Sequence, residues 1–114
     1  MKLIKLRALF KINEGQLETF KQLVPQFISA VREKDQGTLM YDWYLNEETL
    51  ECSVLEDYAD SNAALEHVAN VGDLLQKLMG IGKMSIELYG TPNEELSKAL
   101  DGLDAKVFPY FAGL

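Results

Sequence analysis

The chain has one histidine, His67, and this side chain is the best candidate for proton transfer near neutral pH. On a helix drawn at about 100° per residue, His67 lies at the edge of an apolar stripe, where an imidazole can face a cleft. We therefore predict His67 as the catalytic residue, acting as a general base or a hydrogen-bonding group. The alternative is a boundary histidine that bonds only to the backbone. No Asp or Cys stands in a plausible register to pair with it, and Asp42 and Asn70 are expected to be solvated.

An aromatic segment precedes this histidine: Gly37 to Tyr58 reads GTLMYDWYLNEETLECSVLEDY. Aromatic rings in such a segment either stack against a flat ligand or simply form the core of a sheet, where they pack well. Because a one-residue change of register exchanges the two faces of a strand, the sequence does not decide which face lines a pocket. Apolar helix faces supply the other walls. The predicted ligand-binding residues are Phe20, Val24, Phe27, Tyr41, Trp43, Tyr44 and Val71.

Glu56 has an unusual position for an acidic residue, because it shares a strand face with Val54 and Tyr58. A carboxylate on such a face either pairs with a cation, such as Arg7 or Lys5, or has its pKa raised by burial. The sequence leaves both alternatives open.

Composition excludes several classes of function. The formal net charge of −7 disfavours binding to nucleic acid or to an anionic membrane. With one cysteine, Cys52, and one histidine, neither an internal disulfide nor a four-ligand Cys/His zinc site is possible, and Cys52 is expected to be a small buried hydrophobe. No apolar run reaches the roughly 18 residues of a membrane span, and the first residues, MKLIKLRALFKI, resemble a strand more than a signal peptide. We expect a cytoplasmic protein without a metal site.

The elements that position these residues follow from hydrophobic periodicity and turn signals. Pro25 falls inside the first helical pattern and predicts a kink, or a break near Val24. The expected order is a strand at 3–12, a helix from 17 that ends at 35–37, strands at 39–45 and 50–58, a helix from an N-cap at 60–61 to Gly80, a strand at 84–89 and a short helix at about 94–100.

This order is the β-α-β-β-α-β plan of a ferredoxin-like α+β fold, with one antiparallel sheet and two helices on one face. We expect a single domain over 1–114, with a core at about 3–91 and a C-terminal helix and tail at 92–114. The second face of the sheet is not plainly polar, and an uncovered apolar face is an association site. We therefore predict a homodimer in which two sheets pack face to face. The C-terminal VFPYF is too short to fold by itself and is expected to dock on the partner.

Three features together resemble the antibiotic biosynthesis monooxygenase-like family of the dimeric α/β-barrel superfamily. They are the strand order, YDWYL followed by a turn and CSVLEDY, and D-S-x-x-A-L-x-H on a helix, and the similarity is best over about Leu9 to Tyr89. The resemblance implies a dimer with a pocket between sheet and helices in each subunit, and His67 matches the family's helix histidine. Some members oxygenate polycyclic phenols without metal or flavin, others isomerise or degrade small molecules, and some break down haem.

Haem degradation is not expected for this chain. Haem-degrading relatives carry an asparagine on the first strand and a histidine late in the second helix, whereas this sequence has Arg7, Ala8 and Leu9 on the strand and LLQKLMG in the helix.

Three hypotheses of function remain. The first is a cofactor-independent monooxygenase for a small aromatic phenol or quinol: His67 accepts the proton, and the anion reacts with O₂ directly, so no cofactor is needed. The second is a non-catalytic binding protein for a small aromatic or apolar ligand, favoured by the small number of polar groups. The third is a structural dimer whose aromatic residues are all core.

Overall fold

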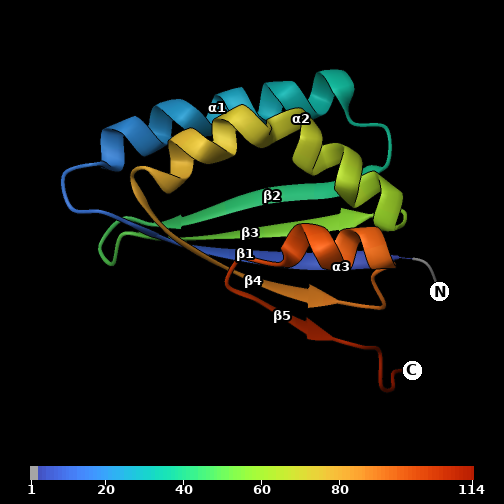
Figure 1. Cartoon of the computed structure of the whole chain (residues 1–114). Coiled ribbons are helices and arrows are strands. Elements are labelled where there is room, and N and C mark those ends of the chain that lie inside the picture. Colours follow the sequence, from blue (N-terminus) through green and yellow to red (C-terminus); the bar gives the residue numbers. More distant parts are fainter. Residues whose placement is uncertain (1–2) are drawn as a thin grey trace.

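The computed structural model describes residues 3–114; Met1 and Lys2, which begin the segment expected to resemble a strand, lie outside the described residues. Along the chain the elements are β1 (Ile4–Ile12), α1 (Leu17–Lys34), β2 (Thr38–Asn46), β3 (Glu51–Tyr58), α2 (Ser61–Met79), β4 (Gly82–Tyr89), α3 (Glu94–Leu100) and β5 (Ala105–Phe108) (Figure 1). The ferredoxin-like β-α-β-β-α-β plan is therefore confirmed, with β5 as an additional strand.

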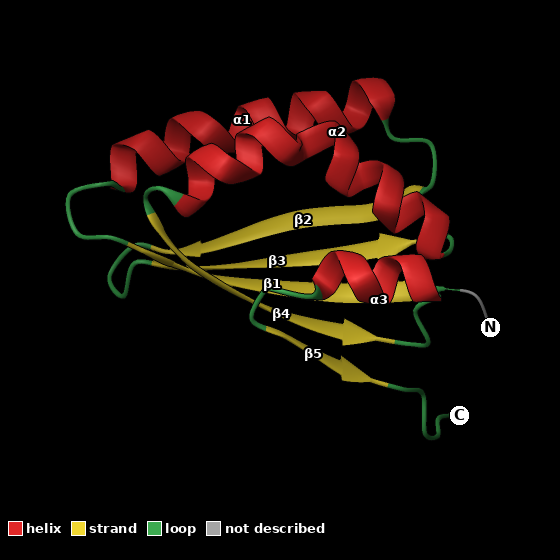
Figure 2. Cartoon of the chain, viewed as in Figure 1, coloured by secondary structure: helices red, strands yellow, loops and turns green. Residues whose placement is uncertain are grey.

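The sheet has the order β2-β3-β1-β4-β5. β1 is antiparallel to both β3 and β4, and β5 runs parallel to β4, so the sheet is mixed and not wholly antiparallel. Figure 2 shows α1 and α2 side by side above one face of the sheet, while the other face carries no helix. α3 lies on the helix-bearing face too, because its buried Leu96 packs with Ile4 and Leu88, which point inward from β1 and β4.

α1 is continuous through Pro25, so the predicted break near Val24 does not occur. Pro25 lies on the exposed side of the helix, where water can satisfy the carbonyl group that loses its hydrogen bond. The buried face of α1 is formed by Phe20, Leu23, Phe27 and Val31.

The hairpin of β2 and β3 has the predicted strands and turn. In its register Tyr41 lies opposite Glu56 and Trp43 opposite Val54, so these residues share the inner face. Simple alternation from Tyr41 and Trp43 would place Leu39 on that face too, but a bulge between Thr38 and Met40 shifts the register, and Leu39 is 64% exposed.

α2 begins at the predicted N-cap, where the side chain of Asp60 accepts a hydrogen bond from the Ala63 backbone N–H at 2.8 Å. Its expected apolar stripe is only partly buried. Val71 and Leu78 are in the core, but Val68 is 41% exposed and Met79 is 49% exposed.

The C-terminal VFPYF was expected to be too short to fold by itself and to dock on the partner. Instead Ala105–Phe108 forms β5 on the free edge of β4, where Ile86 pairs with Ala105 and Tyr89 with Phe108. The backbone groups of an edge strand recruit a short segment with little regard to its side chains, which explains why the sequence pattern did not reveal it.

Cys52 lies in the core, 2% exposed, on the inner face of β3. Burial raises the pKa of its thiol to about 11. Cys52 is therefore a small buried hydrophobe, as predicted.

Candidate functional site

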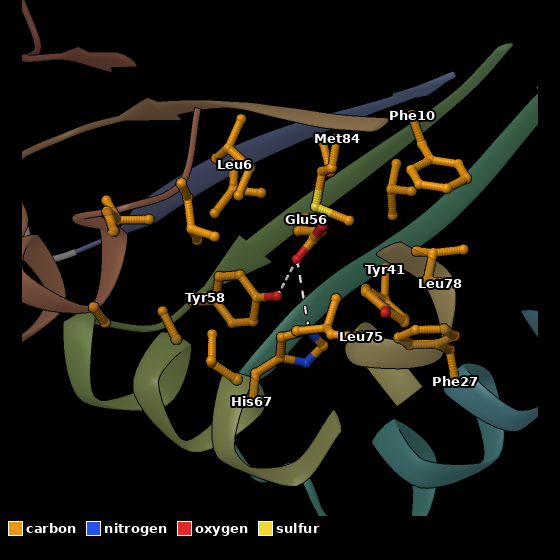
Figure 3. Close-up of a pocket in the computed structure, with 18 of the residues that line it drawn as sticks. Leu6, Phe10, Phe27, Tyr41, Glu56, Tyr58, His67, Leu75, Leu78 and Met84 are labelled. Carbon is orange, nitrogen blue, oxygen red and sulfur yellow. Dashed lines mark hydrogen bonds and ion pairs between the residues drawn. The ribbon is translucent and has the colours of Figure 1, made fainter. Parts of the chain in front are cut away.

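A cavity lies between the inner face of the sheet and the three helices (Figure 3). The space open to the centre of a water molecule is about 100 Å³, which is smaller than a typical drug-sized site but much larger than one water needs. Its wall is almost wholly apolar. The residues that line it are Leu6, Ala8, Phe10, Phe27, Tyr41, Trp43, Val54, Glu56, Tyr58, Ala64, His67, Val68, Leu75, Leu78, Met79, Met84, Ile86, Leu96, Ala99, Leu100 and Leu103.

His67 extends from α2 toward this cavity and is 6% exposed. Its ring is packed edge-on against Tyr41, with ring centroids 5.0 Å apart, and is tilted against Tyr58 at 5.3 Å. Its Nδ1 lies 2.8 Å from Oδ2 of Asp35. The chain therefore does contain a histidine–carboxylate pair, and the expectation that His67 has no Asp partner was wrong.

Asp35 is held by more than the histidine. Its Oδ2 also accepts a hydrogen bond from the Thr38 hydroxyl at 2.7 Å, and its Oδ1 accepts one from the Asn70 side-chain amide at 2.8 Å. Asn70 also donates a hydrogen bond to the Ala30 carbonyl, so it links α2 to α1. The prediction that Asn70 is solvated was therefore wrong. Because the Asp35 carboxylate accepts a hydrogen bond from His67, it favours the His67 tautomer that carries its proton on Nδ1 and leaves the Nε2 lone pair free.

The turn after α1 brings Asp35 to α2 because Gly37 has no side chain. A Cβ atom on Gly37 would lie 2.4 Å from the Cβ of Ala63 in the first turn of α2, far below a normal contact. The Gly37 carbonyl also accepts a hydrogen bond from the Ala59 backbone N–H at 2.9 Å. The absence of a side chain at Gly37 therefore lets the turn that carries Asp35 pack closely against α2, which carries His67.

Glu56 faces His67 from β3, with its Oε1 3.7 Å from His67 Nε2 (Figure 3). The Tyr58 hydroxyl donates a hydrogen bond to the same carboxyl oxygen. Arg7 pairs with Glu87 and Lys5 with Asp57, so neither cation pairs with Glu56. Burial raises the pKa of Glu56 to about 7, with the Tyr58 hydrogen bond acting against the increase and the charge of Asp35 adding to it. Of the two alternatives left open by the sequence, burial is the correct one.

The same burial acts in the opposite direction on His67. Loss of water lowers the pKa of the imidazole below its ordinary value, although the hydrogen bond and the charge of Asp35 raise it. Burial, followed by the charge of Glu56, raises the pKa of both Tyr41 and Tyr58 far above the usual tyrosine value. At neutral pH the site thus holds a neutral imidazole, two protonated phenols and a carboxyl group close to half protonation.

The predicted site residues separate into two groups. His67, Phe27, Tyr41 and Trp43 line the cavity. Phe20, Val24 and Val71 do not line it: Phe20 stacks on Phe10 at 6.0 Å and Val71 is fully buried in the core. Tyr44 is 56% exposed and, next to Trp43 in the strand, points to the opposite face of the sheet.

Sequence reasoning missed Asp35 and left Glu56 and Tyr58 out of the predicted site. Asp35 is the C-cap residue of α1, where a negative charge opposes the helix dipole. That unfavourable placement is the signal that could have marked it. Among residues 3–114, no group of three or more His, Cys, Asp or Glu side chains is arranged to hold a metal ion.

The fold and the cavity define a class: a ferredoxin-like α+β protein with a buried acid–base cluster between sheet and helices. A model of the antibiotic biosynthesis monooxygenase family matches residues 3–72, more than half of the chain. The chain belongs to this family. No curated protein sequence matches it. In the described part of the chain, no helix is long and apolar enough to cross a membrane.

Several solved structures share the fold. MupZ from Pseudomonas fluorescens superposes with a TM-score of 0.85 at 24% identity, over 100% of this chain and 94% of that one. A conserved protein from Methanosarcina mazei has a TM-score of 0.70 at 18% identity, over 78% of this chain and 92% of the other. Rv0793 from Mycobacterium tuberculosis has a TM-score of 0.70 at 17% identity, over 81% of this chain and 97% of the other. The match to MupZ thus extends over the whole chain, including α3 and β5.

Proposed function

We propose that this chain is a cofactor-independent monooxygenase that acts on a small aromatic compound of the phenol or quinol type. The observation that supports it most is the orientation of His67. Asp35 occupies Nδ1, and Nε2 is turned toward the cavity, 3.7 Å from Glu56. A neutral imidazole in this arrangement is a general base for a ligand hydroxyl group.

The reaction begins when Nε2 of His67 takes the phenolic proton. The resulting phenolate has an electron-rich ring carbon, and this carbon forms a bond to O₂. The peroxide, once protonated, loses water and leaves a quinone. One oxygen atom enters the product, the other leaves as water, and the substrate supplies the electrons.

An anion in an apolar cavity needs hydrogen-bond donors. Glu56 supplies one when it is protonated, and its pKa of about 7 makes that form abundant at neutral pH. The hydroxyl of Tyr41 is a second donor in the wall. A ligand oxygen placed between Glu56 and His67 contacts both, because the two side chains are only 3.7 Å apart.

The cavity size sets the class of substrate. A dry cavity of roughly 150 Å³ holds benzene, so a cavity of about 100 Å³ holds at most one aromatic ring unless the wall rearranges. The exposed side chains of Val68 and Met79 belong to this wall, so a larger substrate would extend outward there.

The test is O₂ uptake by the purified protein with simple catechols, naphthoquinols and anthrones. We expect uptake above the spontaneous rate with at least one of them, and a loss of roughly 10² to 10⁴ in rate for His67→Ala. Glu66→Ala, an exposed change one residue away on α2, is the matched control and should keep full activity. Full turnover by His67→Ala would reject His67 as the base.

A second candidate is a non-catalytic binding protein. The nearly wholly apolar wall favours it, because such a wall binds an apolar ligand without any chemistry. Binding of a phenol without O₂ uptake would favour this candidate over the first.

We also propose that the chain forms a homodimer through the uncovered face of the sheet. Tyr44, Tyr89 and Phe108 are exposed, and the last two stack on each other at 5.5 Å. In the strand register they lie on the side away from the helices. A face with these aromatic residues is suited to bury itself against a second copy.

A further inference from the structure

One end of the cavity is covered by α3 and the turn that follows it, residues 94–103, which we call the cap. The cap contributes four apolar side chains to the cavity wall: Leu96, Ala99, Leu100 and Leu103. The family model matches residues 3–72 and therefore ends before the cap begins. This part of the wall is thus a property of this chain that membership of the family does not define.

The cavity wall changes from buried to exposed along the cap. Leu96 is 1% exposed, whereas Leu103 is 39% exposed and Ala99 is exposed as well. On α2, Val68 and Met79 line the cavity and are exposed too. All other side chains of the cavity wall are buried or half-buried. The cavity therefore opens to solvent between α2 and the cap, through a slot bordered by these four exposed side chains.

Gly72 lies on the side of α2 that borders this slot. At about 100° per residue, it is about 40° from Val68 and about 20° from Met79 around the helix axis. Glycine is the least favourable residue inside a helix after proline, so its presence there calls for a reason such as close packing. Here an added Cβ atom would meet no atom within 4 Å. The glycine therefore leaves space beside the slot that a larger side chain would fill.

The cap is fixed at its two ends and is held between them by apolar contacts. Before α3, the Asn93 backbone N–H donates a hydrogen bond to the Ser61 hydroxyl at 3.0 Å. After the turn, the Ile86 backbone N–H donates one to the Asp104 carbonyl at 2.7 Å. In the part of the chain that the structure describes, residues 97–103 make hydrogen bonds only within α3, its N-cap and its turn. Side chains of the cap can thus adjust to a ligand without breaking a hydrogen bond to another element.

The chemistry of the slot restricts what can occupy it. All four side chains at its border are apolar, and the wall of the cavity contains no lysine or arginine that could pair with an anion. A cavity of about 100 Å³ holds at most one aromatic ring, so any further part of a ligand lies in the slot. Each CH₂ group buried there improves the affinity about fourfold, whereas a charged group would lose its water without a counter-ion.

The position of α3 makes the slot narrow. Leu96 of the cap and Ala64 of α2 belong to one core cluster, so the two helices are in contact beside the slot. A gap next to such a contact accepts a thin chain more readily than a branched group, which would force the helices apart.

We infer that the ligand is a single aromatic ring with an unbranched apolar chain, and that this chain occupies the slot between α2 and the cap. Gly72, Ala99 and Leu103 then determine which chains fit. The inference rests on the proposed function for the phenolic ring only, because the slot serves a binding protein as well as an enzyme.

Three probes test it: phenol, 4-butylphenol and 4-tert-butylphenol. The two butylphenols are isomers, so they differ in the shape of the chain and not in its number of carbon atoms. Affinities are measured by calorimetry in the absence of O₂. We expect the wild type to bind 4-butylphenol at least about tenfold more tightly than phenol, which corresponds to about two buried CH₂ groups. It should bind the branched isomer at least about fivefold more weakly than the linear one.

Two variants fill the slot from opposite sides. Ala99→Leu adds bulk on the cap and Gly72→Leu adds it on α2, and leucine is favourable in a helix, so both proteins should fold. Each should weaken 4-butylphenol about tenfold and change phenol less than twofold. Ser97→Leu is the matched control, because Ser97 is exposed on α3 and does not line the cavity. It should leave all three affinities unchanged.

Leu103→Ala makes the opposite change. It removes an exposed side chain from the border of the slot and thereby widens it. The ratio between the affinities for the linear and the branched isomer should therefore decrease at least about twofold.

The inference is overturned if the wild type binds both isomers equally, if the two filling variants weaken phenol as much as 4-butylphenol, or if Ser97→Leu has the same effect as Ala99→Leu. Failure of all three probes to bind at millimolar concentration would overturn it as well. Because no turnover is measured, discrimination between the isomers by a protein that never consumes O₂ would leave this inference standing and remove the proposed oxygenase. O₂ uptake by a protein that does not discriminate between them would remove this inference alone.

Discussion

At the scale of single residues, the site depends on two buried carboxyl groups with different roles. Asp35 accepts hydrogen bonds from His67, Thr38 and Asn70, and these bonds replace the water molecules that a buried carboxylate loses. Glu56 accepts one from Tyr58 and otherwise lies among apolar groups, which raises its pKa. Two similar groups in different surroundings thus provide an orienting anion and a potential proton donor on either side of one imidazole.

Asp35→Asn tests the orienting role. We expect kcat to fall by roughly 10²-fold with little change in KM, because the base is misoriented while the cavity is unchanged. Asp35 raises the pKa of His67, so its neutralisation lowers that pKa further. The acidic limb of the kcat/KM profile should therefore move to lower pH. Asp42→Asn, an exposed change, should leave both the rate and the profile as they are. An unshifted limb with full turnover would show that Asp35 is only structural.

Glu56→Gln tests the buried carboxyl group through stability. The folded-state pKa of Glu56 is about 7 and its ordinary value is 4.5. The folded protein therefore keeps this proton to higher pH than the unfolded chain does. Relative to the Glu56→Gln variant, the wild-type fold has its full stability below pH 4.5 and loses this advantage as the pH rises to about 7. The difference in free energy of unfolding should change by about 3 kcal/mol between these limits. Urea titrations of both proteins from pH 4 to 8 measure it, and a constant difference would contradict the raised pKa.

At the scale of elements, the site exists because three backbone segments meet. The end of α1 supplies Asp35, the inner face of β3 supplies Glu56, and α2 supplies His67. The turn after α1 packs closely against α2 at Gly37, where an added Cβ atom would lie 2.4 Å from that of Ala63.

Gly37→Ala should separate these elements. The added methyl group would collide with Ala63, so we expect a loss of about 1–3 kcal/mol in stability and a weaker Asp35–His67 contact. The His67 ring signals in NMR report the contact, and thermal unfolding reports the stability. Gly72→Ala is the matched control: a Cβ there meets nothing within 4 Å, and alanine favours the helix, so stability should stay equal or rise by up to about 1 kcal/mol. Equal behaviour of the two variants would show that the approach at Gly37 does not matter.

Periodicity predicted the elements well and the site only in part. Alternation along 39–45 and 50–58 was enough to group Tyr41 with Trp43 on one strand and Glu56 with its apolar neighbours on the next. The pairing that puts both groups on the inner face is seen only in the structure, because a one-residue change of register would exchange the faces. The Asp35–His67 contact joins residues 32 positions apart through a turn geometry that no local pattern encodes. The bulge that exposes Leu39 and the pairing of β5 likewise depend on backbone hydrogen bonds, which carry little side-chain signal.

At the scale of the whole molecule, the two faces of the sheet have different surroundings and carry different side chains. The inner face builds the cavity under the helices, and the outer face carries exposed aromatic residues together with the Lys5–Asp57 and Arg7–Glu87 ion pairs. Such surface pairs contribute little to stability. The sheet therefore lies between the candidate ligand site on one side and the proposed dimer contact on the other.

Sedimentation equilibrium tests the dimer. We expect the wild type to be dimeric at micromolar concentration, and Tyr44→Asp to shift it toward the monomer, because the change buries a charge in the contact. Ala69→Asp introduces the same charge at an exposed position on α2 and should remain dimeric. A monomeric wild type, or two variants that behave alike, would contradict association through the outer face.

The burial of Cys52 has a practical consequence for chemical labelling. Its thiol is the only one in the chain, is 2% exposed and has a pKa raised to about 11, so maleimides and similar reagents should not reach it in the folded protein. A cysteine introduced at an exposed position is then the single reactive thiol, without removal of the native residue. Two such cysteines, one on α2 and one on α3, would carry spin labels that report the distance between these helices with and without a ligand.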